Sequence, residues 1–136
     1  MVVNFFAIRV GSLWTRPELA TLWGYKAYQA LARGVVTPAQ DNKIILFVTQ
    51  DKQASTTNYR DVLAGDKLEW EGPNDHYAES RMLAAKKQGE TIHLFYRKRH
   101  HAPFEYKGEL AIVSSNLRLK EPSEFVFKML EGHQQS

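Results

Sequence analysis

Residues 91–113, TIHLFYRKRHHAPFEYKGELAIV, contain two extended runs separated by a short basic turn. The first run, Thr91 to Arg97, and the second, Phe104 to Val113, are rich in the β-branched and aromatic side chains that favour strands. The turn around His100-His101-Ala102-Pro103 is short enough to join them directly. This stretch therefore predicts an antiparallel β-hairpin.

The segments around this hairpin predict further strands. Lys43 to Thr49 is almost wholly apolar, which is typical of a strand buried on both faces. Lys67 to Glu71 alternates apolar and charged residues between two turn signals, and Phe125 to Leu130 forms a last extended run. The polar stretches at 51–58 and 131–136 are expected to be a loop and a tail.

Three helices are expected. Thr15-Arg16-Pro17-Glu18 has the pattern of a capping box and predicts a helix that ends at Gly24. A second short helix from about Lys26 to Arg33 would complete a helical hairpin, and a third is expected at Tyr77 to Gln88. The fold class expected is α+β, with a mostly antiparallel, curled or barrel-like sheet.

Length and composition restrict the class of protein. With 136 residues, of which 43% are hydrophobic and 24% charged, the chain is expected to form one soluble domain over residues 1–136. The absence of cysteine excludes disulfide frameworks, zinc fingers and thiol nucleophiles, and fits a cytoplasmic location. No apolar run approaches the ~18 residues needed to cross a bilayer, so no membrane partner is expected. No glycine-rich phosphate loop is present, and no cofactor is expected.

The charges are distributed unevenly, although the net charge is only +3. Residues 91–103 contain no acidic residue, whereas residues 61–75 contain five acids and one lysine. The basic turn is therefore the predicted contact with DNA phosphates, through Arg97, Lys98, Arg99, His100 and His101. The alternative is an ordinary solvated hairpin tip.

A second candidate site combines aromatic and polar side chains. A base that leaves the DNA stack needs a flat face to stack on and polar groups for its Watson–Crick edge. The residues expected to supply them are Tyr59, Asn58, Asp61 and Trp70. Core packing of the aromatics and a solvated acidic face are the alternatives.

The N-terminal helical pair and the histidines have more than one interpretation. The pair is similar to helix-turn-helix sequences, in which Lys26, Gln29 and Arg33 would read the major groove; plain scaffolding is the alternative. His93, inside an apolar strand, is expected to be a core residue. No metal-ligand pattern is present, so we expect a non-enzyme, with a small metal-dependent nuclease as the alternative.

Several segments together resemble a known family. They are Thr15 to Leu19, Gly34 to Val36, Ile45 to Thr49, Thr57 to Asp61, Ile92 to Arg99 and Ala102 to Gly108. Over about residues 13–113, the chain resembles a bacterial domain of unknown function. That domain occurs C-terminal to superfamily 2 helicases and beside nucleases, including type IV restriction enzymes that cut modified DNA.

The resemblance implies a function in phage defence. It implies a fold like that of SET- and RING-associated (SRA) or PUA domains, and a non-catalytic module that recognises 5-methylcytosine-type duplex DNA, with base flipping. The partners implied are double-stranded DNA and a nuclease or helicase domain or subunit, whose sequences this chain does not contain. Two alternatives stay open: a protein-interaction domain of a restriction complex, and a helix-turn-helix DNA binder without modification specificity.

Overall fold

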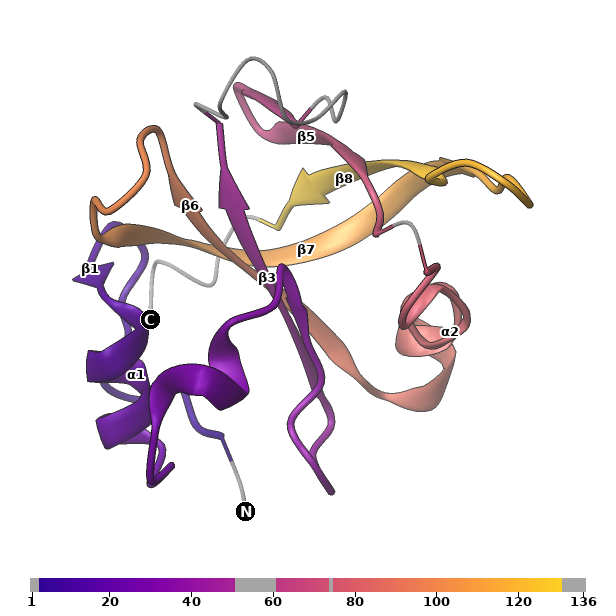
Figure 1. Cartoon of the computed structure of the whole chain (residues 1–136). Helices are drawn as coiled ribbons and strands as arrows, with labels where there is room; N and C mark the ends of the chain where they lie inside the picture. The colour runs from indigo at the N-terminus through magenta and orange to yellow at the C-terminus, as the bar shows by residue number, and fades with distance from the viewer. Residues whose placement is uncertain (1–2, 51–60, 74, 131–136) are drawn as a thin grey trace.

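The computed structural model describes residues 3–50, 61–73 and 75–130, and within them the chain has an α+β fold with eight strands (Figure 1). The strands are β1 (Leu13–Trp14), β2 (Val35–Val36), β3 (Lys43–Thr49), β4 (Val62–Ala64), β5 (Lys67–Glu71), β6 (Thr91–Arg97), β7 (Phe104–Asn116) and β8 (Glu124–Met129). The helices are α1 (Arg16–Leu22) and α2 (Glu79–Gln88), with a short 3-10 helix, η1 (Tyr28–Leu31).

The strands form one mostly antiparallel sheet in the order β2-β3-β6-β7-β8-β5-β4, and β1 pairs with β7. The single parallel pair among the described strands is β3 with β6, where Ile44 lies opposite Ile92. A parallel pair needs a long crossover connection. That connection carries β4, β5 and α2.

The expectation of a curled or barrel-like sheet is wrong. A barrel requires its two edge strands to pair with each other. Here β2 and β4 are the two ends of the strand order, and no pairing joins them in the described part of the chain. The strand pattern along a sequence does not encode which strands become neighbours, so it could not distinguish an open sheet from a closed one.

The first helix follows its sequence signal closely. The Thr15 hydroxyl accepts a hydrogen bond from the Glu18 amide at 3.2 Å, and the Glu18 carboxylate accepts one from the Thr15 amide at 2.9 Å. Both halves of the predicted capping box are therefore present.

The second helix differs from the prediction. Residues 26–33 contain only the four-residue 3-10 helix η1, whose N-cap, Ala27, makes no side-chain hydrogen bond. An alanine cannot accept from the first amides of a helix, which leaves them without the partner that the first helix has. The expected helical hairpin is thus one α-helix followed by a single tight turn.

The remaining predicted elements are present in the structure, but some of them begin or end at other residues than expected. α2 begins at Glu79, two residues later than expected, because His76 and Ala78 have positive φ angles of 58° and 67°. The hairpin of β6 and β7 is confirmed, and β7 continues three residues past the expected end, to Asn116. The two- and three-residue strands β1, β2 and β4 were not expected.

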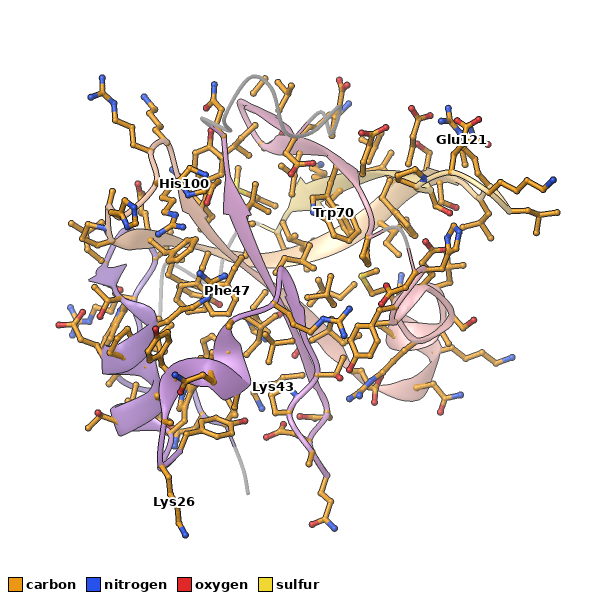
Figure 2. All side chains as sticks on the ribbon, in the orientation of Figure 1. Lys26, Lys43, Phe47, Trp70, His100 and Glu121 are labelled. Atoms are coloured by element: carbon orange, nitrogen blue, oxygen red, sulfur yellow. The ribbon has the colours of Figure 1, made fainter. Side chains whose placement is uncertain are left out.

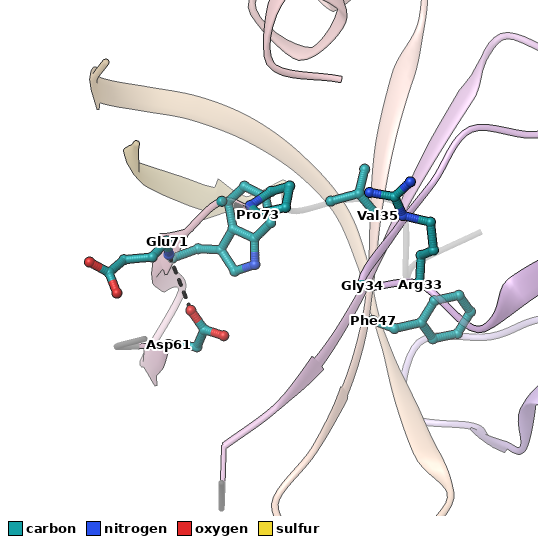
Figure 3. Close-up of a pocket in the computed structure, with 9 residues that line it drawn as sticks. Arg33, Gly34, Val35, Phe47, Asp61, Glu71 and Pro73 are labelled. Carbon is teal, nitrogen blue, oxygen red and sulfur yellow. Dashed lines mark hydrogen bonds between the residues drawn. The ribbon is translucent and has the colours of Figure 1, made fainter. Parts of the chain in front are cut away.

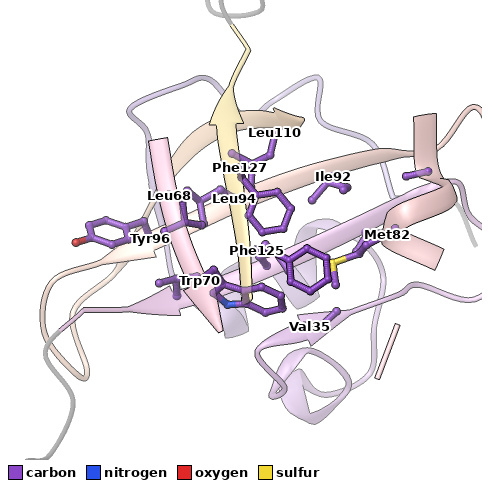
Figure 4. Close-up of a cluster of buried hydrophobic side chains, with 14 residues drawn as sticks. Val35, Leu68, Trp70, Met82, Ile92, Leu94, Tyr96, Leu110, Phe125 and Phe127 are labelled. Carbon is purple, nitrogen blue, oxygen red and sulfur yellow. The ribbon is translucent and has the colours of Figure 1, made fainter. Parts of the chain in front are cut away.

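Two apolar clusters hold the sheet on its two faces. Along β3, Ile44, Leu46 and Val48 belong to one cluster, whereas Ile45 and Phe47 belong to the other. The first cluster contains Trp70 and the α2 residue Met82 (Figure 4); the second contains Leu19 of α1. β3 is therefore buried on both faces, as its apolar sequence predicts.

Candidate nucleic-acid interface

A cavity of about 240 Å³ opens between β5 and the segment that joins η1 to β2 (Figure 3). Its volume is below the range of about 300–1,000 Å³ typical of sites for drug-sized ligands, so it suits a single small ring system. One wall contains Asp61, Trp70, Glu71, Gly72 and Pro73; the other contains Arg33, Gly34, Val35 and Phe47.

The first wall carries a buried carboxylate. Asp61 is only 8% exposed, and its Oδ1 accepts a hydrogen bond from the Glu71 backbone amide at 3.1 Å. This bond ties the residue before β4 to the end of β5. A carboxylate is a hydrogen-bond acceptor with two oxygens.

Trp70 stands on the same wall and belongs to the core. Its ring packs at tilted angles against Phe125 and Phe127, with centroids 5.7 and 5.8 Å away. The structure thus brings Asp61 and Trp70, two of the four residues expected in a base pocket, to one cavity. The other two, Tyr59 and Asn58, lie outside the described residues.

The opposite wall contains Arg33, which the sequence placed on a groove-reading helix. Arg33 follows η1 instead, and its Nη2 donates to Asp75 Oδ2 at 3.1 Å. Its guanidinium lies over the Tyr77 ring, 4.2 Å from the centroid. The Tyr77 amide, and then Arg33, lower the pKa of the exposed Asp75 carboxyl.

The other two residues of that predicted set are exposed and lie elsewhere. Gln29 is in η1, and Lys26 lies at the end of the molecule opposite His100 and Trp70 in Figure 2. A four-residue 3-10 turn is not the recognition helix that a helix-turn-helix interpretation requires. The structure therefore does not bring Lys26, Gln29 and Arg33 together as a reading surface.

The basic turn between β6 and β7 is a group of exposed cations. Lys98, Arg99, His100 and His101 are all exposed, and none of the four forms an ion pair with another residue of the described ranges. His101 adopts a positive φ of 68°, which closes the turn. In Figure 2, His100 and Trp70 lie in the same half of the molecule, with Phe47 below them.

Arg97, at the end of β6, is held differently from the rest of the basic turn. Its Nε donates to Thr49 Oγ1 at 2.7 Å and its Nη1 to the Ala102 carbonyl at 3.3 Å. Its guanidinium lies 4.2 Å from the centroid of the Phe104 ring, and burial lowers its pKa. Part of its hydrogen-bonding capacity is thus used within the protein.

Arg16 is a half-buried cation that the sequence did not single out. Its Nε donates to the Leu31 carbonyl at 2.5 Å, and its guanidinium lies over the rings of Phe47 (4.7 Å) and Phe104 (5.0 Å). Burial, and then the positive charge of Arg97, lower its pKa to about 10. In the sequence, Arg16 is only the first residue after a helix cap, which is why no pattern identified it.

The catalytic alternative was based on histidine and acidic side chains. In the described segments, no three His, Asp or Glu side chains come close enough to hold a metal ion. His93 is buried, and its ring nitrogens hydrogen-bond to Tyr106 Oη at 2.8 Å and Thr91 Oγ1 at 2.9 Å. Its interpretation as a core histidine is confirmed. No described helix is long and apolar enough to span a membrane.

Comparisons with known proteins agree on the fold. No protein-family model matches the chain, and no curated protein matches its sequence. The SRA domain of SUVH5 in complex with hemimethylated CG DNA is similar at a TM-score of 0.67 and 14% identity, over 98% of this chain and 96% of that one. The same domain bound to fully hydroxymethylated CG DNA gives 0.62 and 13%, with the same coverage.

A third similarity is weaker. The DNA modification-dependent restriction endonuclease AspBHI is similar at a TM-score of 0.46 and 11% identity, over 68% of this chain and 57% of that one, which is too low to support a comparison of architecture. The SUVH5 structures show that the chain has an SRA-like fold. This confirms the fold that the sequence resemblance implied, apart from the curl of the sheet.

Proposed function

We propose that this protein is a non-catalytic reader of modified cytosine in duplex DNA, and that it takes one base out of the stack into the cavity lined by Asp61 and Trp70. The observation that supports this most directly is the buried Asp61 carboxylate beside Trp70 in a cavity of about 240 Å³. The SRA-like fold is the second support, because the similar SUVH5 domains are found in complexes with methylated and hydroxymethylated DNA.

The chemistry of the cavity suits cytosine. The exocyclic amine on C4 is a hydrogen-bond donor, and Asp61 is an acceptor fixed by the Glu71 amide. Trp70 supplies aromatic surface on one wall. Extruding a base costs a few kcal/mol of stacking and pairing, and contacts of this kind offset that cost.

The basic turn would supply the affinity for the DNA backbone. Lys98 and Arg99 are exposed cations free to reach phosphates, and His100 and His101 extend the same surface. The half-buried pair Arg16 and Arg97 adds positive potential beside Phe47. Such contacts are independent of sequence and weaken steeply with salt.

We further propose that a cytoplasmic nuclease or helicase domain or subunit uses this specificity. Three exposed apolar residues at the distal end of the β7–β8 hairpin, Val113, Leu117 and Leu119, offer a surface for such a partner. The same residues favour the second candidate function, a protein-interaction domain that does not bind DNA.

Titration decides between these functions. Duplexes of one sequence, with a central cytosine that is unmodified, hemimethylated or fully methylated, are bound at one fixed salt concentration, and 2-aminopurine beside the target base reports unstacking. We expect at least tenfold tighter binding of a methylated duplex, together with a fluorescence increase. Equal affinities would remove the claim of modification reading, and no binding to any duplex would favour the protein-interaction function.

A further inference from the structure

Arg16 and Arg97 hold two guanidinium groups against the same aromatic ring. The Cζ atom of Arg97 lies 4.2 Å from the centroid of the Phe104 ring, and that of Arg16 lies 5.0 Å from it. The two charges interact, because burial and then the positive charge of Arg97 lower the pKa of Arg16 to about 10. Arg16 is still a cation at neutral pH, so the protein holds two like charges close together here.

Both guanidiniums lie on the face of the sheet that packs against α1. Phe47 and Thr49 are two residues apart on β3 and so share a face. Phe47 belongs to the apolar cluster that contains Leu19 of α1. Arg97 reaches this face because its Nε donates to Thr49 Oγ1 at 2.7 Å, and Arg16 reaches it because its Cζ lies 4.7 Å from the Phe47 centroid.

Neither of these two arginines has an acidic partner. In the parts of the chain that the structure describes, no ion pair includes Arg16 or Arg97. Arg81, a half-buried arginine of α2, is by contrast paired with Glu90 at 2.9 Å. Two like charges partly removed from water disfavour each other, and an anion bound to both would offset this cost.

Both guanidiniums keep hydrogen-bond donors that no described acceptor uses. Arg16 donates from Nε to the Leu31 carbonyl at 2.5 Å and from Nη2 to the Arg33 carbonyl at 3.4 Å. Arg97 donates from Nε to a hydroxyl and from Nη1 to the Ala102 carbonyl. A guanidinium has five N–H donors, so each arginine has donors left for a ligand. Because these bonds already hold the side chains in place, binding costs little side-chain entropy.

The position of the two arginines favours phosphate as the ligand. Arginine recognises phosphate with paired N–H donors, which a point charge such as lysine cannot do. Arg97 directly precedes Lys98 and Arg99, which are exposed. A polyanion held by the basic turn therefore also reaches Arg97, and this favours a phosphate of a nucleic-acid backbone.

We propose that Arg16 and Arg97 together form a binding site for one phosphate group, and that in the complex this phosphate belongs to the DNA backbone. The assignment to DNA rests on the proposed function, whereas the phosphate site itself does not. Trp70 belongs to the apolar cluster on the other face of β3. The phosphate site therefore contributes affinity without contacting the base.

Inorganic phosphate alone tests the phosphate site. Melting temperatures of the wild type, Arg16→Met, Arg97→Met and Arg81→Met are measured in phosphate and in chloride at equal ionic strength and pH. We expect about 20 mM phosphate to raise those of the wild type and Arg81→Met by about 3 °C, and those of the other two variants not at all. Each protein is compared with itself, so a change in basal stability does not affect the result.

Arg81→Met is the matched control for this measurement. Arg81 is also half-buried and also donates to a backbone carbonyl, that of Asp41 at 2.8 Å, but it has an acidic partner. No phosphate-dependent rise in the wild type, or an equal rise in all four proteins, would overturn the phosphate site.

Titration with DNA tests where the phosphate comes from. Methylated and unmodified duplexes of one sequence are titrated with the same four proteins. We expect Arg16→Met and Arg97→Met to bind both duplexes about tenfold more weakly than the wild type, because hydrogen bonds to a charged group are lost. The slope of log K against log salt should fall by about one in each, and Arg81→Met should bind as the wild type does.

The outcomes separate the proposals. Unchanged DNA affinity in Arg16→Met, together with the phosphate-dependent rise in the wild type, would overturn the assignment to DNA and leave a site for free phosphate. A larger loss on methylated than on unmodified DNA would overturn the claim that the two arginines act on the backbone. Equal binding of both duplexes by the wild type would overturn the proposed function, while the melting temperatures in phosphate would still decide the phosphate site.

Discussion

The cavity lined by Asp61 and Trp70 and the basic turn at residues 98–101 differ in how far their side chains are buried and held by other groups. Asp61 and Trp70 are buried and are held by a backbone amide and by the rings of Phe125 and Phe127. The side chains of residues 98–101 are exposed and have no ion-pair partner within the described ranges. Fixed, buried polar groups penalise a wrong ligand, because each unmatched group loses a hydrogen bond. Exposed cations attract any phosphate. We therefore expect discrimination to reside in the cavity and general affinity in the turn.

The largest expected effect tests the cavity side of this comparison. Asp61→Asn keeps an oxygen for the Glu71 amide and removes the negative charge. We expect binding of modified duplexes to weaken by about 2 kcal/mol, roughly 30-fold, with little change for unmodified DNA. Titrations of both duplexes measure it, with Asp66→Asn in an exposed turn as the matched control. An equal loss on both duplexes would place Asp61 outside the reading of the base.

The next largest effect is a difference in stability between variants of two arginines of the basic turn, Arg97 and Arg99. Arg97→Ala removes hydrogen bonds to Thr49 and Ala102 and the contact with the Phe104 ring. We expect the free energy of unfolding to fall by about 1.5 kcal/mol. Arg99→Ala, in the exposed part of the turn, should leave it unchanged. Chemical denaturation of both variants measures this, and equal stabilities would mean that Arg97 is as loosely held as Arg99.

A third variant tests the turn as a source of general affinity. Lys98→Ala combined with Arg99→Ala should weaken modified and unmodified duplexes alike, by about 1 kcal/mol, because two phosphate contacts are lost. The slope of log K against log salt should fall by about two. Titrations from 50 to 200 mM salt measure it. A change in the ratio of modified to unmodified binding would contradict the division between cavity and turn.

The smallest expected effect is a pH dependence of stability at His76, which follows the cavity-wall residue Pro73 in the chain. His76 Nδ1 pairs with Glu79 at 2.7 Å, and the His76 amide donates to the carbonyl of Pro73, a residue of the cavity wall. The hydrogen bond to Glu79 raises the pKa of His76. Its stabilisation is therefore complete below the ordinary histidine pKa of about 6.5 and is lost as the pH rises through the raised value.

We expect the melting temperature of the wild type to fall between pH 6 and pH 8 by more than that of His76→Gln, which has no titrating group at this position. Melting curves at pH 6, 7 and 8 measure the difference. His100→Gln, in the exposed turn, is the matched control. Parallel curves for the wild type and His76→Gln would show that the pair does not stabilise the rim.

Local signals in the sequence predicted the local structure well. The capping box at Thr15 and Glu18, the doubly buried strand at Lys43–Thr49 and the core position of His93 depend on neighbouring residues or on a short period, and the structure confirms them. The prediction failed where a segment had no cap, as at Ala27, or where closure of the sheet depended on distant strands.

The candidate site was predicted in part. Asp61 and Trp70 stood out because an acid and an aromatic suit a base, and both line the cavity. Arg33 was assigned to a helix that does not form, and Arg16 was not noticed at all. Neither could have been placed, because their roles depend on Phe47, Tyr77 and Phe104, which reach them only through the packing of the sheet.

Residue type and short-range pattern were enough to establish the five longer strands, the first helix, the basic turn and the chemistry available for a base. Which of these groups face one another was decided by the folded chain alone. The distance between Asp61 and Arg33 in space is set by strand order and by the two apolar clusters. Such contacts join residues that are far apart in the sequence, so a local sequence pattern cannot predict them.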